Sequence, residues 1–258
     1  MRPAEKAAAP RRRPAPQGQR LRIATYNIHG CIGMDGRYAP NRIAAVLQAL
    51  DADVIGLQEV DSRRPPYEEL PQFRYFERAT GLHAVAGPAI RDPRGDYGNM
   101  ILTRLKPRAV RHIDLSVPGR EPRGALDVDL KAPDGGILRV INLHLGLQPA
   151  ERARQIDRLI EALEHATETG LRTVLIGDFN EWSRGARARL AEVTAQFPAA
   201  IVPRSYPAPA PLLRLDRIYA SPAPAWIRPV PPATILARYS SDHLPVCVEL
   251  AWGPAAAV

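Results

Sequence analysis

The sequence contains no apolar run long enough to cross a membrane, and its first twenty residues lack the apolar centre of a secretory signal. It also contains only two cysteines in 258 residues, Cys31 and Cys247, each in an apolar setting. Two isolated cysteines do not form the framework of a disulfide scaffold and do not have the spacing of a zinc site. We therefore expect buried thiols in a cytoplasmic protein.

Acidic residues are scarce at the N-terminus. Residues 1–22 hold seven basic residues against Glu5 alone, so most of the net charge of +8 lies there and the rest of the chain is close to neutral. Residues 1–20 combine Pro, Ala and Arg without hydrophobic periodicity, which predicts a disordered tail. Such a basic tail can contact a polyanion, either nucleic acid or an anionic membrane surface. It can equally be a solvated and dispensable leader.

The rest of the chain reads as many strands with a few helices. Apolar residues at helical spacing predict helices at residues 41–50 and 150–166. Gly177 is expected to end the strand that contains Thr173, and the prolines of residues 203–211 predict an extended loop. The pattern is typical of a single α+β domain in which two sheets pack together with helices outside. Short apolar or alternating runs predict strands at residues 21–28, 53–60, 97–104, 107–115, 124–130, 137–145, 171–177, 215–220 and 243–250.

Polar side chains stand beside many of these apolar segments. A single Asp or Asn at a strand end usually caps a turn. Here the pattern recurs, and the ends of strands in a common sheet converge in space, where clefts form. Carboxylates, amides and histidines without a nucleophilic Ser or Cys motif are typical of a hydrolase that uses a hard divalent metal. The residues are Asn27, His29, Glu59, Asn99, His144, Asp178, Asn180, Asp216, Asp242 and His243.

Seven short motifs follow one another between residues 21 and 250: ATYNIHG, IGLQEVD, YGNMILTR, NLHL, LIGDFN, LDRIY and SSDHLP. Together they resemble the motif set of the endonuclease/exonuclease/phosphatase superfamily, which has the deoxyribonuclease-I-like fold, and they resemble its small stand-alone bacterial members. The resemblance implies a four-layer α/β sandwich, with two mainly antiparallel β-sheets face to face and helices on the outside. It places the catalytic domain at residues 21–252 and leaves residues 253–258 as a short C-terminal tail.

The resemblance also implies a site for Mg²⁺ or Mn²⁺. Glu59 would be the principal carboxylate ligand, and Asn27 and Asp242 would complete the site directly or through water. Because Mg²⁺ keeps several of its waters, few protein ligands are sufficient.

Five further residues take catalytic roles by the same resemblance. Asp178 would orient or deprotonate the attacking water, and Asn180 would hold that water or a phosphate oxygen. His243 would contact the scissile phosphate, with Asp216 fixing its tautomer and favouring the imidazolium. His144 would face the phosphate from the other sheet and stabilise developing negative charge or the leaving oxygen.

Three residues are expected to contact the substrate. Asn99 and Arg123 would bind phosphate oxygens. His29 is a substrate-side candidate that stands where some nuclease members carry an acidic residue. From the residues alone, His144 could also be an interior histidine and Arg123 a surface ion-pair partner.

The fold does not determine the substrate. The first hypothesis is a metal-dependent phosphodiesterase of the nuclease type that acts on DNA or RNA, supported by the catalytic set and the Arg-rich tail. The second is a phosphatase or phospholipase-like enzyme that acts on a lipid head group or a small phosphoester. The third is an inactive scaffold that binds nucleic acid or a protein, and the intact set of charged residues disfavours it. We expect a monomer.

Overall fold

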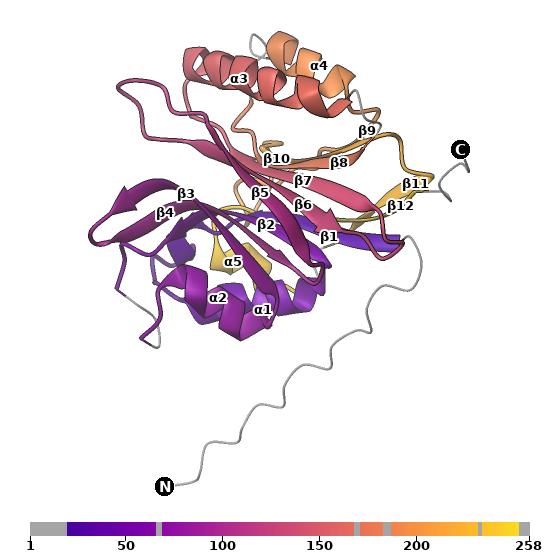
Figure 1. Cartoon of the computed structure of the whole chain (residues 1–258). Coiled ribbons are helices and arrows are strands. Elements are labelled where there is room, and N and C mark those ends of the chain that lie inside the picture. The colour runs from indigo at the N-terminus through magenta and orange to yellow at the C-terminus, as the bar shows by residue number, and fades with distance from the viewer. Residues whose placement is uncertain (1–19, 66–68, 168–170, 183–186, 232–233, 253–258) are drawn as a thin grey trace, which may run out of the picture.

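The computed structural model describes residues 20–65, 69–167, 171–182, 187–231 and 234–252. Within them the chain forms two six-stranded sheets that lie face to face, with helices on their outer sides (Figure 1). The predicted four-layer α/β sandwich is confirmed. Arg20 is already the first residue of a strand, so the expected N-terminal tail falls outside the described residues from residue 19 backward. The expected C-terminal tail lies outside them too.

Each sheet combines one parallel pair of strands with antiparallel neighbours. The parallel pairs are β1 with β2 and β7 with β8. In spatial order, the first sheet contains β11 (Trp226–Val230), β12 (Val246–Ala251), β1 (Arg20–Asn27), β2 (Val54–Asp61), β4 (Gly95–Thr103) and β3 (His83–Asp92). The second sheet contains β5 (Pro107–Asp114), β6 (Gly124–Lys131), β7 (Ile137–His144), β8 (Arg172–Asp178), β10 (Asp216–Ser221) and β9 (Ala199–Ile201).

The helices cover the two outer faces. The first sheet is covered by α1, α2 and α5, and the second by α3 and α4 (Figure 1). No helix in the described segments is long and apolar enough to cross a membrane. In the part of the chain that the structure describes, the helices are α1 (Pro40–Leu50), α2 (Gln72–Thr80), α3 (Pro149–Thr167), α4 (Arg187–Ala195) and α5 (Ala237–Ser240), together with a 3₁₀ turn, η1 (His29–Cys31).

Alternation of side chains along the strands divides the core into three layers. Between the sheets, Ile23 and Val54 of the first sheet belong to the same buried cluster as Val140 and Ile176 of the second. The opposite faces of the sheets pack against the helices in two further clusters. Burying one such aliphatic side chain contributes about 1.5–3 kcal/mol. The two sheets are thereby fixed face to face, and strand ends from both of them meet at one edge.

The strand β8 runs through Gly177 to Asp178, so the expectation that Gly177 ends the strand is wrong. Gly177 has a φ of 145°, and a Cβ at this position would lie 2.0 Å from the carbonyl oxygen of Leu143. Only glycine permits this backbone and this close approach of β7 to β8. The glycine therefore allows β8 to continue for one more residue and to carry Asp178 to the edge of the sheet.

Candidate active site

Three neighbouring strands of the second sheet bring polar side chains into one row. The register places His144 of β7 beside Asp178 of β8, and Asp178 beside Asp216 of β10. All three side chains are buried. The convergence expected from the sequence is therefore present on this sheet, and His243, from the segment before β12, reaches it from the first sheet.

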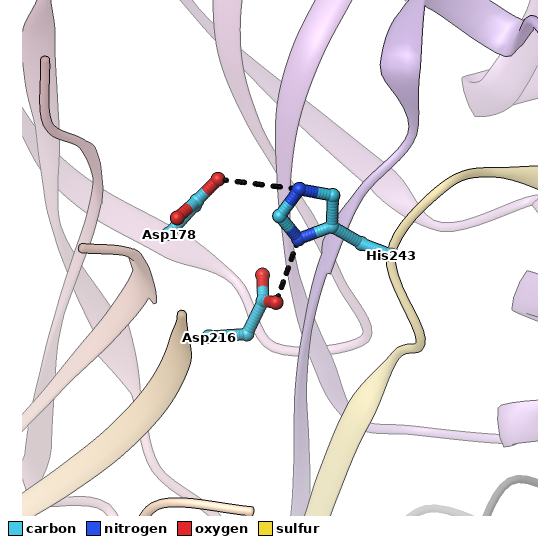
Figure 2. A group of neighbouring side chains, drawn as sticks. All are labelled: Asp178, Asp216 and His243. Atoms are coloured by element: carbon cyan, nitrogen blue, oxygen red, sulfur yellow. Dashed lines mark hydrogen bonds and ion pairs between the residues drawn. The ribbon is translucent and has the colours of Figure 1, made fainter. Parts of the chain in front are cut away.

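His243 lies between two carboxylates (Figure 2). Its Nδ1 is 2.8 Å from Oδ2 of Asp216, and its Nε2 is 3.7 Å from Oδ2 of Asp178. Burial disfavours the charged ring, but the carboxylates of Asp216 and Asp178 outweigh burial and raise the pKa of His243 to about 10. At neutral pH His243 is therefore an imidazolium with an N–H on each ring nitrogen.

Asp178 is held by two donors. Nδ2 of Asn27 is 3.0 Å from its Oδ2, and the backbone N–H of Asn180 donates to its Oδ1 at 2.9 Å. Burial raises the pKa of Asp178 to about 6, while the neighbouring His243 acts in the opposite direction. A carboxylate with a pKa near neutrality is suited to accept a proton from water.

Asp178, Asp216 and His243 could be considered as a metal site, because their ligand atoms lie within 4.8 Å of one another. Both nitrogens of His243 face carboxylates, so the same three side chains can also hold and exchange protons.

Glu59 occupies a strained position at the end of β2. The register of β2 against β4 shifts between Leu57 and Val60, and Glu59 has a φ of 59°. Non-glycine residues rarely adopt this backbone, and such strain is common at functional sites. Oε1 of Glu59 lies 3.0 Å from Nδ2 of Asn27 and 4.0 Å from Nε2 of His144. The bulge thus directs the carboxylate toward the row on the second sheet.

Asp242 lies next to His29, which follows Asn27 by two residues. Its Oδ1 is 3.7 Å from Nδ1 of His29, and the preceding Ser241 donates its hydroxyl to the backbone carbonyl of Asn27 at 2.7 Å. The side chains of Asp242 and Glu59 are 26% and 24% exposed, so both carboxylates are accessible from solvent.

The side-chain oxygens of Glu59, Asn27 and Asp242 are of the chemical type that binds a hard divalent cation, since Mg²⁺ and Mn²⁺ prefer carboxylate and amide oxygens as ligands. Asn27 directs its amide nitrogen at Glu59 and Asp178, and its Oδ1 accepts the backbone N–H of His29 at 3.0 Å. This geometry gives Asn27 a bridging position between two carboxylates. The ligand roles of the three residues stay predictions.

His144 faces donors on both sides. Its Nδ1 is 3.4 Å from Nη1 of Arg123, and its Nε2 is 3.1 Å from Nδ2 of Asn180. Burial, with the positive charges of Arg123 and His243, holds the pKa of His144 well below its usual range. A neutral imidazole accepts at one nitrogen only, so just one of these two contacts is a hydrogen bond, and the ring supplies no positive charge.

Arg123 is buried rather than on the surface. Its guanidinium lies beside His144, 3.3 Å from the hydroxyl of Tyr97, and it pairs with the exposed Glu121 at 2.6 Å. It therefore places a fixed positive charge at the site, as phosphate binding requires. This role remains a prediction.

The other two residues expected to contact the substrate, Asn99 and His29, lie in positions that support this role less clearly. Nδ2 of Asn99 donates to the backbone carbonyls of Gly124 and Asn142 at 2.7 and 3.4 Å, which ties β4 to the second sheet. The amide donor that would bind a phosphate is used in this contact. His29 lies at the rim beside Asp242, with 43% of its side chain exposed.

Two buried amides beneath the site were not predicted. Gln58 donates to Oδ1 of Asn142 at 2.6 Å, and Asn142 donates to the backbone carbonyls of Leu57 and Met100. This network joins the two sheets below the row of His144, Asp178 and Asp216. The alternation along β7 contains a signal for it, because Asn142 stands two residues before His144 and so shares its face.

Tyr206 belongs to the proline-containing loop of residues 203–211. Its ring lies against the ring of His243, with centroids 5.0 Å apart. The surrounding loop is tied to the His243 segment by two backbone hydrogen bonds, from Ala208 to Asp242 at 2.7 Å and from Leu244 to Ser205 at 2.8 Å. The loop of residues 203–211 therefore supports one side of His243.

Comparison with known proteins agrees with this arrangement. The sequence model described as the Endonuclease/Exonuclease/phosphatase family matches residues 24–243, which include every expected site residue. The chain belongs to this family. Members of the endonuclease/exonuclease/phosphatase family are hydrolases that act on phosphoesters.

Three similar proteins illustrate the extent of the similarity. The uncharacterized protein YbhP of Escherichia coli strain K12 is 31% identical over 254 residues, which covers 89% of this chain and 96% of YbhP. A family member from Beutenbergia cavernae shares the fold with a TM-score of 0.69 and 22% identity, over 92% of this chain and 72% of that one. A mannosyl-6-phosphatase of Bacteroides thetaiotaomicron has a TM-score of 0.66 and 19% identity, over 90% of this chain and all of that one.

Proposed function

We propose that the protein is a divalent-metal-dependent phosphoesterase that hydrolyses phosphodiester bonds in the manner of a nuclease. The observation that carries the proposal is the placement of Asp178 beside His243. One group has a pKa of about 6 and can accept a proton, and the other has a pKa of about 10 and stays cationic. Two neighbouring titratable groups with separated pKa values are the usual basis of acid–base catalysis.

In the proposed reaction, Asp178 accepts a proton from water as the water oxygen attacks phosphorus. The bond from phosphorus to the leaving oxygen breaks in line with the attack, and the electron pair of that bond stays on the leaving oxygen, which takes a proton from solvent. His243 and Arg123 stabilise the negative charge that accumulates on the phosphate oxygens, and Asn180 orients the water or one of these oxygens. A Mg²⁺ or Mn²⁺ ion bound by Glu59, with Asn27 and Asp242, would supply further positive charge to the phosphate.

The test is a turnover panel with Mg²⁺, with Mn²⁺ and with chelator. Its substrates are bis(p-nitrophenyl) phosphate, p-nitrophenyl phosphate, DNA, RNA and phospholipid. We expect metal-dependent diester hydrolysis that falls by roughly 10²–10³ in Asp178→Ala and in His243→Ala. Arg108→Ala, on an exposed residue of β5 at the far side of the second sheet, is the control and should retain wild-type turnover. Wild-type turnover in either active-site variant would refute the assigned roles.

A second candidate is a phosphatase or phospholipase-like activity on a small phosphoester or a lipid head group. It is favoured by the nearly neutral charge of the chain after residue 22, because enzymes that grip long polyanions usually carry a basic surface. Faster turnover of a monoester or phospholipid than of nucleic acid would select this candidate. A wild-type protein that hydrolyses nothing but binds nucleic acid would select the inactive scaffold instead.

We further propose that the basic N-terminus contacts polyanionic substrates and that the protein acts as a cytoplasmic monomer. Cys31 and Cys247 are both buried free thiols, as a reducing compartment allows. Deleting residues 1–19 should raise KM for nucleic acid and flatten its dependence on salt, because fewer counterions are released on binding. Turnover of bis(p-nitrophenyl) phosphate should not change. An unchanged salt dependence would remove this role from the tail.

A further inference from the structure

A cavity of about 510 Å³ lies on the outer side of the second sheet, between α4, β10 and the segment before β10. Its lining contains none of the predicted site residues. The volume falls in the range of small-molecule sites in proteins, roughly 300–1,000 Å³. The residues that give the cavity its chemistry are Glu181, Trp182, Arg204, Leu212, Arg214 and Arg217.

The cavity begins next to the catalytic edge. Trp182 follows Asn180 by two residues, and Arg214 precedes Asp216 by two residues. Two residues of extended chain span at most about 7 Å. Arg217 and Asp216 are successive residues of β10, so their side chains point to opposite faces of the sheet. The cavity is therefore a separate site, and a chain-like substrate could reach it by passing over the sheet edge.

The cavity is lined by three guanidinium groups, of Arg204, Arg214 and Arg217. Among the residues that the structure describes, none of the three forms an ion pair with a carboxylate. Glu181 is the acidic residue in the lining, and its carboxylate is already paired with the buried Arg152 at 3.0 Å. The cavity therefore carries an excess of positive charge.

The positive charge of Arg217 is unfavourable in this cavity unless an anion binds there. The residue is 8% exposed, and its guanidinium donates to the backbone carbonyls of Glu181 and Arg214 at 2.8 and 3.3 Å and to the hydroxyl of Tyr219 at 3.3 Å. All three acceptors are neutral, as is the ring of Phe179, whose centroid lies 5.6 Å from the guanidinium carbon. A buried cation without a counter-ion is unfavourable. The fork of an arginine matches phosphate oxygens, so a phosphate is the anion that these groups suit best.

The mouth of the cavity presents a flat apolar surface beside these cations. Trp182 is 45% exposed and Leu212 is 67% exposed. The guanidinium carbon of Arg152 lies 4.9 Å from the ring centroid of Trp182, which fixes the orientation of the indole. An oriented, exposed indole is a stacking platform for a nucleobase.

We propose that this cavity is a subsite for the nucleotide unit adjacent to the scissile phosphate. The guanidinium groups of Arg204, Arg214 and Arg217 bind the phosphate of that unit, and Trp182 stacks on its base. The inference rests on the proposed phosphodiesterase function and specifies its substrate as a nucleotide chain.

The first test measures binding in chelator, where no turnover occurs. The thymidine dinucleotide with a 5′-phosphate should quench the fluorescence of Trp182, and Trp182→Phe should abolish the quenching. Affinity should fall at least about tenfold in Arg204→Gln/Arg214→Gln, since two charge-assisted hydrogen bonds are lost. The matched control Arg74→Gln/Arg108→Gln removes the same charge from exposed positions elsewhere and should bind like wild type. Equal affinity in the two double variants, or equal affinity for inorganic phosphate and the dinucleotide, would overturn the proposal.

The second test separates the subsite from the chemistry. The measured quantity is kcat/KM for a dinucleotide p-nitrophenyl ester divided by kcat/KM for bis(p-nitrophenyl) phosphate. We expect Arg204→Gln/Arg214→Gln to lower this ratio at least tenfold, because the KM for the dinucleotide ester rises. A ratio equal to that of the control double variant would refute the subsite while leaving the phosphodiesterase function intact. If the wild type hydrolyses neither ester, the proposed function fails, and the binding test still decides whether the cavity takes a nucleotide.

Discussion

Nδ1 of His243 lies 2.8 Å from Oδ2 of Asp216, and both side chains are almost completely buried. Asp216 begins β10 of the second sheet, whereas His243 precedes β12 of the first. The pair therefore joins the two sheets at the edge where the other polar residues converge. The same contact keeps the imidazole charged, because the carboxylate compensates for the loss of hydration.

Asp216→Asn should change the pH dependence of turnover. In the wild type the pKa of His243 is raised to about 10, so the imidazolium is present below that pH and is lost as the pH rises through it. Without the carboxylate of Asp216 this pKa falls, because burial disfavours the charged ring and the carboxylates of Asp178 and Asp242 are left to oppose it. We expect kcat to fall and its alkaline limb to move to lower pH. The pH profile of kcat measures this directly, and a lower kcat with an unmoved alkaline limb would contradict the role of Asp216.

The same pair should contribute stability over a defined pH window. A group whose pKa is raised on folding contributes fully below its unfolded value of about 6.5 and loses that contribution as the pH rises through the folded value. The difference in free energy of unfolding between wild type and Asp216→Asn should therefore shrink at alkaline pH, near 10. Urea unfolding at pH 6, 8 and 10 would show it.

Asn142→Leu should destabilise the protein by about 3 kcal/mol. The substitution keeps the side-chain volume but leaves the carbonyl groups of Leu57 and Met100 without their donor. It also removes one acceptor of the Gln58 amide, which keeps its hydrogen bond to Thr25. Leaving one buried hydrogen-bonding group without its partner destabilises a protein more than replacing both partners by apolar side chains. Urea unfolding of Asn142→Leu, Gln58→Leu and the double variant should give a double-variant loss smaller than the sum of the two single losses. Additive losses would show that the two amides act independently.

Much of the site could be predicted because its residues stand beside long apolar strands. Asp178 and His144 end strands whose period and length are clear in the sequence, and the register then places them side by side. Tyr206 and Arg217 could not be placed in this way. Tyr206 belongs to a proline-rich loop, and its contact with His243 depends on tertiary hydrogen bonds that the sequence does not show. Arg217 follows Asp216 directly in β10, and its side chain points to the opposite face of the sheet, away from the site. The end of β8 was misjudged because Gly177 was interpreted as a strand breaker, whereas the close approach of β7 makes glycine necessary inside the strand.

Glu249→Gln should destabilise the fold without touching the catalytic edge. Glu249, on β12, is bound by Arg20, by Arg22 at 2.7 Å and by Arg228 at 2.9 Å. Although burial acts to raise it, these three arginines hold the pKa of Glu249 at about 2, below the usual 4.5. Its contribution is therefore present above about pH 4.5 and is lost as the pH falls through about 2.

Urea unfolding at pH 7 and pH 3 tests this. The difference between wild type and Glu249→Gln should be large at pH 7 and smaller at pH 3. Asp35→Asn is a suitable comparison, because Asp35 also pairs with an arginine, Arg42, but lies in solvent. Exposed pairs contribute little, so Asp35→Asn should have almost no effect at either pH. If the loss of unfolding free energy in Glu249→Gln is the same at both pH values, the packing of this side chain stabilises the fold and its charge does not.

Tyr206 should act as a positioning residue for His243. Its ring lies 5.0 Å from the imidazole, tilted by 55°. An aromatic ring beside an imidazolium both restricts its rotation and favours its charged form. We expect Tyr206→Ala to lower kcat about tenfold on bis(p-nitrophenyl) phosphate and to shift the alkaline limb of kcat to lower pH.

Tyr206→Phe separates this role from others, because it keeps the ring and removes the hydroxyl. If the ring supports His243, the phenylalanine variant restores both kcat and the alkaline limb. If instead the hydroxyl contacts the substrate, Tyr206→Phe raises KM as Tyr206→Ala does, and the limb stays in place in both. A loss of kcat in Tyr206→Ala with an unshifted limb would assign Tyr206 to the structure of its loop, since the loop is tied to Asp242 and Leu244 on either side of His243.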